Sequence, residues 1–247
     1  MKKLIILIGC LILITACQSA TPSPVPSPVP TSTSLPTPIP ATASPTPFPT
    51  LAFSPTPFPR FFTEQFDASL AGWTILQAGN DGVPNISNEN SHLILQMDFP
   101  YTWLYAIYGP HDYSNVRLDI QFENRAFTPS SVGLICRYSE EAGWFEYNVA
   151  TDGAYNVLYG SWLSVGIAEY LPIMDGVSKE IQPSGAVQKI GLICSDTTLS
   201  LFINETLIRR ADVSRYELTE GKVGITVSSY ENIPIVVGID SVTISEP

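Results

Sequence analysis

Histidine, cysteine and basic residues are scarce in this 247-residue chain, and each shortage excludes a kind of chemistry. The two histidines, His92 and His111, have no metal-ligand spacing to each other or to a cysteine, so the chain has no zinc-site motif. The motifs of metalloproteases, serine hydrolases and P-loop proteins are absent as well. The sequence therefore disfavours the enzyme classes that short motifs identify.

Basic residues are outnumbered where the chain looks globular. All 23 Asp and Glu residues lie after position 60, against nine Lys and Arg residues, so residues 61–247 have a net charge of −14. A domain this acidic repels nucleic acid and anionic glycopolymers at long range. Neutral glycans, cations and other proteins are left as candidate partners.

No hydrophobic run is long enough to cross a membrane as a helix. The longest, Leu4–Ile14, has 11 residues, whereas a spanning helix needs about 20. It follows Lys2 and Lys3 and ends in Ile14-Thr15-Ala16-Cys17, which resembles the bacterial lipobox. We expect residues 1–16 to be a lipoprotein signal peptide and Cys17 to carry the lipid that anchors the chain to the cell membrane, outside the cytoplasm. The alternative is an ordinary secreted protein with an incidental cysteine.

Proline is concentrated in one part of the chain. Residues 17–59 hold 14 of the 22 prolines, mixed with Thr and Ser in units such as Ser44-Pro45-Thr46-Pro47. Proline fixes φ and removes a backbone donor, so this composition favours polyproline II and cannot bury a core. We predict a disordered stalk that reaches on the order of 100 Å at about 3.1 Å per residue. A ligand for proline-binding modules is the alternative.

Residues 60–247 read as one folded domain made of short strands. The clearest, Val116–Glu123, is apolar at every even position and polar at every odd one, which is typical of a half-buried strand. No segment sustains a 3.6-residue period, so any helix should be a single turn. About a dozen strands in one domain predict an all-β fold of two packed antiparallel sheets. The other strands are predicted at 92–98, 103–108, 131–138, 144–150, 154–159, 187–194, 199–204, 222–228 and 233–244.

The order of several motifs resembles the concanavalin A-like jelly rolls, in particular bacterial laminin-G-like and 3-keto-disaccharide hydrolase (glucanase-like) domains. The resemblance covers residues 62–245 and implies a jelly-roll β-sandwich, a fold that hosts lectins, hydrolases and adhesion modules. Glu205 stands where the group often has glycine after its L-x-L-x-x-N strand. The motifs are Phe66-Asp67 with Gly72-Trp73, then Val132–Tyr138, Trp144–Val149, Asp152–Tyr155, Leu199–Asn204, Lys222–Ile225 and Val237–Val242.

Cys136 and Cys194 are the two cysteines of the predicted domain, and each ends a Gly-Leu-Ile-Cys segment. Outside the cytoplasm such a pair most simply forms one disulfide. Two buried free thiols are the alternative.

Four polar or aromatic residues are predicted to form a ligand surface. If Cys136 and Tyr138 face the core, Arg137 faces outward, and Trp144, Glu146 and Asn148 share that outer, concave face. An indole stacks on a pyranose, while guanidinium, carboxylate and amide groups bind vicinal hydroxyls. The alternative is an Arg137–Glu146 cross-strand ion pair.

The remaining polar and aromatic groups have simpler interpretations. The paired glutamates of laminarinase-type members, E-x-D-x-x-E, are absent, which leaves Glu146 as the first carboxyl to test for catalysis. Glu140 and Glu141 are interpreted as a solvated turn, and Trp162 belongs to an aromatic set that favours core packing over a ligand platform. Asp67 and Asp240, on the terminal strands, could hold a structural Ca²⁺, although strand pairing explains them equally.

Three functions follow. The first is a cell-surface lipoprotein whose jelly-roll domain binds a neutral glycan without cleaving it. The second is a laminin-G-like adhesion module that recognises a surface protein. The third is a glycoside hydrolase that resembles 3-keto-disaccharide hydrolases. No other cofactor is expected.

Overall fold

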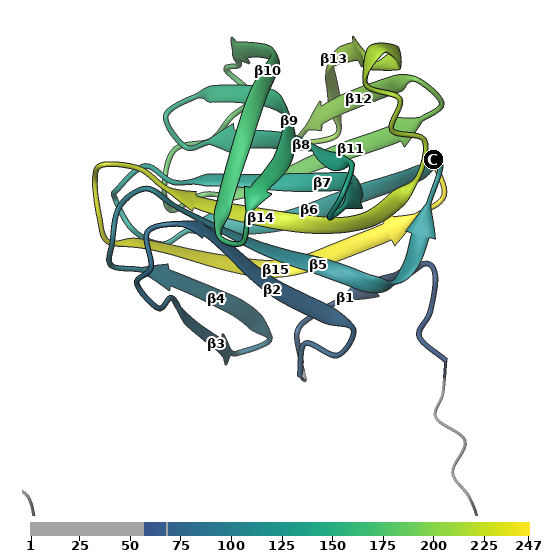
Figure 1. Cartoon of the computed structure of the whole chain (residues 1–247). Coiled ribbons are helices and arrows are strands. Elements are labelled where there is room, and N and C mark those ends of the chain that lie inside the picture. The colour runs from purple at the N-terminus through teal and green to yellow at the C-terminus, as the bar shows by residue number, and fades with distance from the viewer. Residues whose placement is uncertain (1–56, 68) are drawn as a thin grey trace, which may run out of the picture. The chain divides into compact units, whose positions relative to one another are not determined.

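Two antiparallel sheets face each other across a hydrophobic core (Figure 1). The computed structural model describes residues 57–67 and 69–247, within one compact unit, Ser54–Pro247. The predicted signal peptide, Cys17 and nearly all of the predicted stalk lie outside the described residues and stay predictions. The described residues show the predicted all-β sandwich, and the one helix among them is a single 3-10 turn, Ser214–Tyr216.

The first sheet has eight strands in the order β13-β12-β11-β6-β15-β4-β3, with β1 paired to β15. The second has seven strands in the order β10-β9-β8-β7-β14-β5-β2. The first comprises β1 (Phe62–Glu64), β3 (Asn85–Glu89), β4 (His92–Met97), β6 (Val116–Asn124), β11 (Val187–Ser195), β12 (Thr198–Ile203), β13 (Thr206–Asp212) and β15 (Ile235–Ser245). The second comprises β2 (Trp73–Gly79), β5 (Thr102–Tyr113), β7 (Ser131–Ser139), β8 (Gly143–Ala150), β9 (Ala154–Ser164), β10 (Ile167–Val177) and β14 (Gly221–Ser229).

The core forms because each inner strand places alternate side chains on its inner face. Along β6, Val116, Leu118, Ile120 and Phe122 are buried and the residues between them are partly exposed, as the alternation predicts. They pack with inward side chains of β7, β8 and β14 in one cluster. Each such side chain contributes about 1.5–3 kcal/mol when it leaves water.

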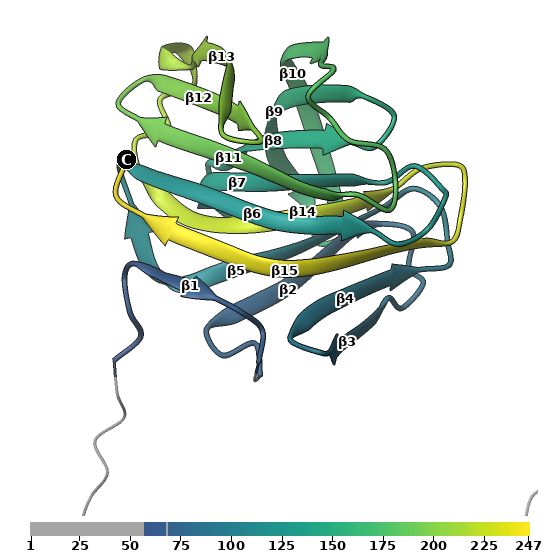
Figure 2. The ribbon, with the colours of Figure 1, turned by 180° about the vertical axis from the view of Figure 1, so that it is seen from behind.

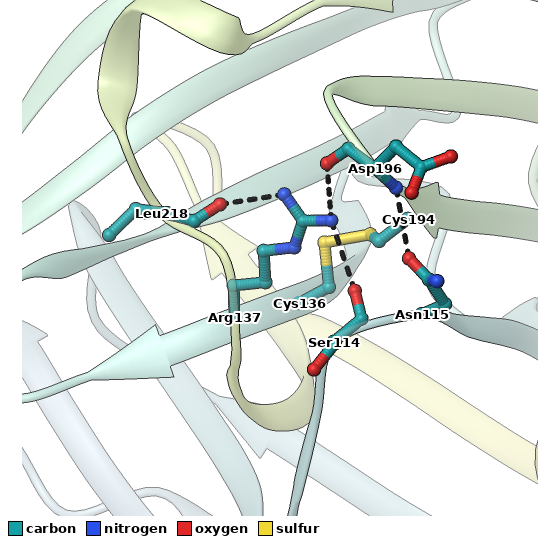
Figure 3. The surroundings of a disulfide bond; sticks show 7 residues. All are labelled: Ser114, Asn115, Cys136, Arg137, Cys194, Asp196 and Leu218. Carbon is teal, nitrogen blue, oxygen red and sulfur yellow. Dashed lines mark hydrogen bonds between the residues drawn. A yellow bond between two sulfur atoms is a disulfide. The ribbon is translucent and has the colours of Figure 1, made fainter.

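A disulfide fastens the two sheets together. It joins Cys136 of β7 to Cys194 of β11, across 58 residues of chain (Figure 3). Both cysteines are buried in the core cluster. The predicted disulfide is therefore confirmed.

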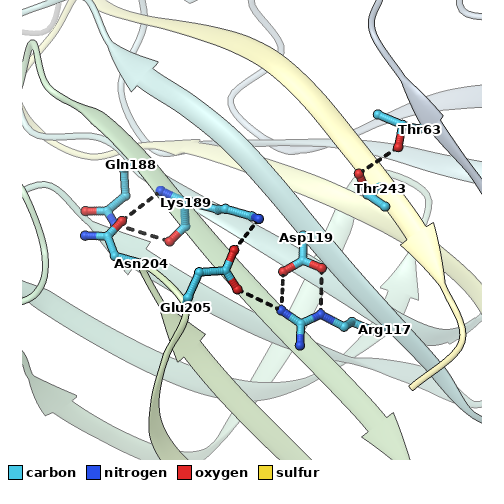
Figure 4. Close-up of polar contacts among 8 residues, drawn as sticks. All are labelled: Thr63, Arg117, Asp119, Gln188, Lys189, Asn204, Glu205 and Thr243. Carbon is cyan, nitrogen blue, oxygen red and sulfur yellow. Dashed lines mark hydrogen bonds and ion pairs between the residues drawn. The ribbon is translucent and has the colours of Figure 1, made fainter.

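Charged residues on the outer face of the eight-stranded sheet pair with one another (Figure 4). Arg117 donates two hydrogen bonds to Asp119 at 2.7 and 2.8 Å, and Glu205 contacts both Arg117 and Lys189. Lys189, and secondarily Arg117, hold the pKa of Glu205 below its usual range. Glu205 and Asn204 both have positive φ in the β12–β13 hairpin, a conformation that glycine adopts more easily. These two ion pairs give a glutamate a favourable role where the resembling group often has glycine.

The start of the described chain is fixed to β5. Three consecutive carbonyls, those of Phe58, Pro59 and Arg60, accept hydrogen bonds from His111 at 2.9 Å, Tyr108 at 2.7 Å and Tyr113 at 2.6 Å. Only after these contacts does β1 pair with β15. The chain is thus attached to the seven-stranded sheet before it enters the eight-stranded one.

Candidate ligand groove on the concave face

The seven-stranded sheet curves until its two edges approach each other. The β9–β10 hairpin folds across its outer face toward β2 at the opposite edge (Figures 1 and 2), and the amide of Gly79 donates to the carbonyl of Gly166 at 3.1 Å. Residues on the β9–β10 turn and on β2 are thereby joined although they lie on opposite flanks of the sheet. We call this outer face the concave face.

Glu146 lies at the centre of a buried polar and aromatic cluster on the concave face. Its carboxylate accepts hydrogen bonds from the indole of Trp144 at 2.9 Å and from the amide of Asn148 at 2.8 Å, and it also bonds Tyr170 of β10. Tyr170 in turn bonds the hydroxyl of Tyr105 on β5. Burial raises the pKa of Glu146, although these hydrogen bonds oppose the rise.

The structure places three of the four predicted ligand residues on one face but covers them. Trp144 and Glu146 are 0% exposed and Asn148 is 5% exposed. They alternate on β8 with the core residues Phe145 and Tyr147, as the period of two predicts. Alternation in the sequence does not reveal the second layer of aromatic side chains that buries them. Their role in ligand binding stays a prediction.

Arg137 does not join them, and the predicted orientation of Arg137 and Tyr138 is wrong. Arg137 has a φ of 55° at an irregularity in the β7–β8 pairing, between the pairs Cys136–Phe145 and Ser139–Gly143. A bulge of this kind breaks the alternation of faces. Tyr138 therefore lies against Trp144 on the concave face, with ring centroids 5.6 Å apart, and Arg137 points to the disulfide side.

The buried guanidinium of Arg137 links three chain segments (Figure 3). It donates to the carbonyls of Leu218 at 2.6 Å, Asp196 at 2.6 Å and Ser114 at 3.0 Å, and the side chain is 2% exposed. Burial lowers the pKa of Arg137. The guanidinium donates to these three carbonyls and not to Glu146, so the alternative Arg137–Glu146 ion pair is also wrong. Arg137 fastens one end of the sandwich.

An open groove runs beside the buried cluster; one part lies between β2 and the β9–β10 hairpin, and the other lies over β2, β5, β7 and β14. Its apolar part has a volume of about 460 Å³ and its polar part about 360 Å³, and Leu76, Tyr138 and Glu140 line both. The apolar part is also lined by Ile75, Gln77, Trp162, Ser164, Val165 and Gly166; the polar part is also lined by Thr74, Ile107, Gly109, Asp112, Ser139, Glu220, Gly221 and Lys222. We call the two parts together the concave groove.

The chemistry of the concave groove suits a polyhydroxylated ligand. The indole of Trp162 donates to the hydroxyl of Tyr138 at 3.0 Å, which leaves the Tyr138 proton free to donate elsewhere. Burial raises the pKa of Tyr138, so its hydroxyl stays protonated at neutral pH. The exposed carboxylate of Glu140 stands beside these two rings, and Lys222 pairs with Asp112 at 3.2 Å in the polar part.

Sequence reasoning missed Tyr138, Glu140 and Trp162 as members of a site. Tyr138 reaches the groove only because of the bulge at Arg137, and Glu140 is in the turn that follows it. Trp162 lies on the part of β9 that extends past β8, whose last pair is Trp144–Gly160. One signal in the sequence points to Trp162, namely the aromatic set to which it belongs, although such a set favours core packing over a ligand platform.

Metal ligands do not gather in the part of the chain that the structure describes: no three His, Cys, Asp or Glu side chains there could hold a metal ion. Asp240 accepts a hydrogen bond from Gln121 at 2.9 Å and lies 3.5 Å from His92. Asp67 lies in the segment after β1 and not on a strand. Across residues 57–67 and 69–247, no helix has the length and apolar character of a membrane span.

Comparison with solved structures identifies the fold. A β-glucanase of Bacillus licheniformis superposes with a TM-score of 0.54 at 10% sequence identity, over 76% of this chain and 98% of the glucanase. A Bacillus subtilis protein of unknown function with a galectin-like fold gives 0.54 at 10% identity, over 75% of this chain and 94% of that protein. A β-1,3-1,4-glucanase from a mouse hindgut metagenome gives 0.54 at 13% identity, over 76% and 99%.

The domain therefore has the concanavalin A-like jelly-roll fold that the order of motifs predicts. No protein-family model matches the chain. No curated protein matches it either.

Proposed function

We propose that this domain binds a neutral oligosaccharide in the concave groove and does not cleave it. The observation that carries the proposal is the juxtaposition of Trp162, Tyr138 and Glu140 in an open groove on the concave face of this jelly roll. Aromatic rings stack on the C–H faces of sugars, and a carboxylate accepts hydrogen bonds from vicinal hydroxyls. The β-glucanases among the structures of this fold lend support, since glucans are the polymers in their names.

We infer the absence of cleavage from the number and placement of the carboxyl groups. Glycosidases use two carboxyl groups flanking the scissile bond, about 5–5.5 Å apart in retaining enzymes. Glu146 is the single carboxyl-bearing residue that is buried in the described part of the chain. Glu140 is exposed at the groove surface. Tyr138 and Trp162, which line the same groove, lie between Glu140 and the buried cluster: Trp162 bonds Tyr138 and contacts the ring of Trp144. This arrangement supports binding better than hydrolysis.

The proposal includes a location. A signal peptide at 1–16, a lipidated Cys17 and a stalk up to residue 59 would hold the domain at the cell surface, within reach of external glycans. The buried disulfide supports an oxidising compartment. Mass spectrometry of the protein from its native membrane tests the anchor. The proposal predicts a diacylated N-terminal cysteine at position 17.

Two adjacent glutamates give a matched test of the groove. Titration calorimetry of the full chain with a mixed-linkage β-1,3-1,4-gluco-tetrasaccharide should show saturable binding. Glu140→Ala should weaken it at least about tenfold, because hydrogen bonds to a charged group are worth about 1.5–3 kcal/mol. Glu141→Ala is the control, since Glu141 is exposed in the same turn but does not line the groove.

Equal affinities in the two variants would remove Glu140 from the site. Absence of binding across a panel of neutral oligosaccharides would overturn the proposal and leave the adhesion alternative, which a binding assay with surface proteins addresses. Release of reducing ends from the tetrasaccharide, lost in Glu146→Gln, would establish the hydrolase alternative instead.

A further inference from the structure

The end of the β9–β10 hairpin is an arm without a neighbouring strand. The pairing of β9 with β8 ends at Gly160, whereas β9 and β10 continue to pair with each other up to Ser164 and Ile167. We call residues 161–169 the arm. Because the arm pairs only with itself, the hydrogen bonds of a central sheet strand do not hold it in place.

A few contacts hold the arm over the concave face. At its tip, the carbonyl of Gly166 accepts the amide of Gly79, and at its middle Trp162 donates to Tyr138. Tyr170, directly after the arm, bonds Glu146 and Tyr105. The apolar part of the concave groove already separates the arm from most of β2.

The apolar side chains on the outer side of the arm are not buried in this position. Leu163, Val165 and Ile167 are 65%, 102% and 56% exposed, so three apolar side chains at the tip remain in water. These three side chains therefore contribute little to keeping the arm closed, whereas Trp162 and Ala168 on its inner side pack against the aromatic cluster.

The concave face beside Glu146 carries polar groups that have no hydrogen-bond partner. Glu146 is buried with hydrogen-bond donors but without a cation, and the side-chain oxygens of Asn148 and Thr226 have no hydrogen-bond partner. Asn148 and Thr226 flank Gly133 on neighbouring strands, close to the position that a Cβ of Gly133 would occupy. Buried polar atoms without partners are costly, and native proteins keep few of them.

We propose that the arm is a movable cover, and that its displacement joins Trp144, Glu146 and Asn148 to the concave groove as the floor of one longer glycan site. The floor then offers an indole next to a carboxylate and an amide, which is the combination that binds a pyranose. The unsatisfied oxygens of Asn148 and Thr226 gain partners in water or in ligand hydroxyls. This inference rests on the proposed glycan binding but concerns access to the site.

Removal of one hydroxyl tests the cover. Tyr170→Phe keeps the ring of Tyr170 and deletes its bonds to Glu146 and Tyr105, and Trp162→Phe deletes the bond to Tyr138. Tyr159→Phe is the matched control, because Tyr159 lies on the same hairpin, faces the core and donates one hydrogen bond, to Ala142 at 2.8 Å. The first readout needs no ligand: NMR measures how fast the indole N–H of Trp144 exchanges with water.

Faster exchange of the Trp144 indole is expected in Tyr170→Phe and Trp162→Phe and not in Tyr159→Phe. The tetrasaccharide used above should bind Tyr170→Phe about three- to tenfold more tightly than the unmodified chain, because apparent affinity rises with the fraction of open molecules. The gain should vanish in Tyr170→Phe combined with Glu146→Gln.

Unchanged exchange in both loosened variants would overturn the cover. Faster exchange in Tyr170→Phe with unchanged or weaker binding of the tetrasaccharide would also overturn it, because the floor would then not be part of the site. If neither the variants nor the unmodified chain binds any sugar, that result counts against the proposed function instead.

Discussion

Glu146 is a single residue whose ionisation should be visible in the stability of the whole domain. Burial raises the pKa of this carboxyl in the folded state, so between the unfolded and the folded pKa the folded protein holds more protons than the unfolded one. The stabilisation that results is complete below the unfolded pKa and is lost as pH rises through the folded value. Above the usual pKa of a glutamate, the buried carboxyl group of Glu146 therefore lowers the free energy of unfolding.

Glu146→Gln imitates the protonated carboxyl and should remove this pH dependence. We expect the free energy of unfolding of the unmodified domain to fall, relative to the variant, as pH rises above the usual range of a glutamate. Urea denaturation from pH 4 to pH 8 measures both curves. Glu205 and Asp212, whose pKa values are lowered, contribute with the opposite sign but equally in both proteins. Parallel curves would contradict the prediction.

The predicted site also shows which side-chain orientations cannot be predicted from the sequence. The positions of Trp144, Glu146 and Asn148 on one face follow from alternation, because nothing interrupts the period of two along β8. The position of Arg137 does not follow, since one left-handed residue exchanges the faces after Cys136. Nothing in the sequence Cys136-Arg137-Tyr138 indicates a bulge, so alternation alone predicts the wrong face for Tyr138.

Among the elements, β8 and β9 approach closely because Gly160 has no side chain. A Cβ at this position would lie 2.4 Å from the indole of Trp144, which is buried and has little room to shift. We expect Gly160→Ala to destabilise the domain by about 1–3 kcal/mol through overpacking, as measured by urea denaturation. Gly109→Ala is the control, because its Cβ would meet nothing nearer than 3.7 Å. Equal stability of the two variants would show that Trp144 can move.

Strands with one buried and one solvent-exposed face could be predicted from the sequence. Strands without a clear buried face could not. The predicted segments from 92 to 244 correspond to β4 to β9, β11, β12, β14 and β15. In contrast, β10 has apolar residues on its exposed side. It also has Pro172 at an irregularity of pairing, which an edge strand tolerates. The short β3 is mostly polar. The missed β10 is the strand that carries the cover over the concave face.

For the whole molecule, the link between the sheets is the disulfide at one end of the sandwich. Closing a loop of 58 residues should stabilise the fold by about 4 kcal/mol in the chain-entropy model. The double variant Cys136→Ala with Cys194→Ala should lower the free energy of unfolding by about 2–4 kcal/mol in urea and keep the far-ultraviolet spectrum of a β-protein. A loss below about 1 kcal/mol would mean that Arg137 and its three carbonyls hold this end without the covalent link.

The attachment of the first described residues to β5 determines how the domain responds to tension. A pull on the chain upstream of Pro57 acts first on the hydrogen bonds that His111, Tyr108 and Tyr113 make with three successive carbonyls. The force therefore reaches β5, which has partners on both sides, before it can peel β1 from β15. A domain fastened in this way is expected to keep β1 in place when the preceding chain is pulled.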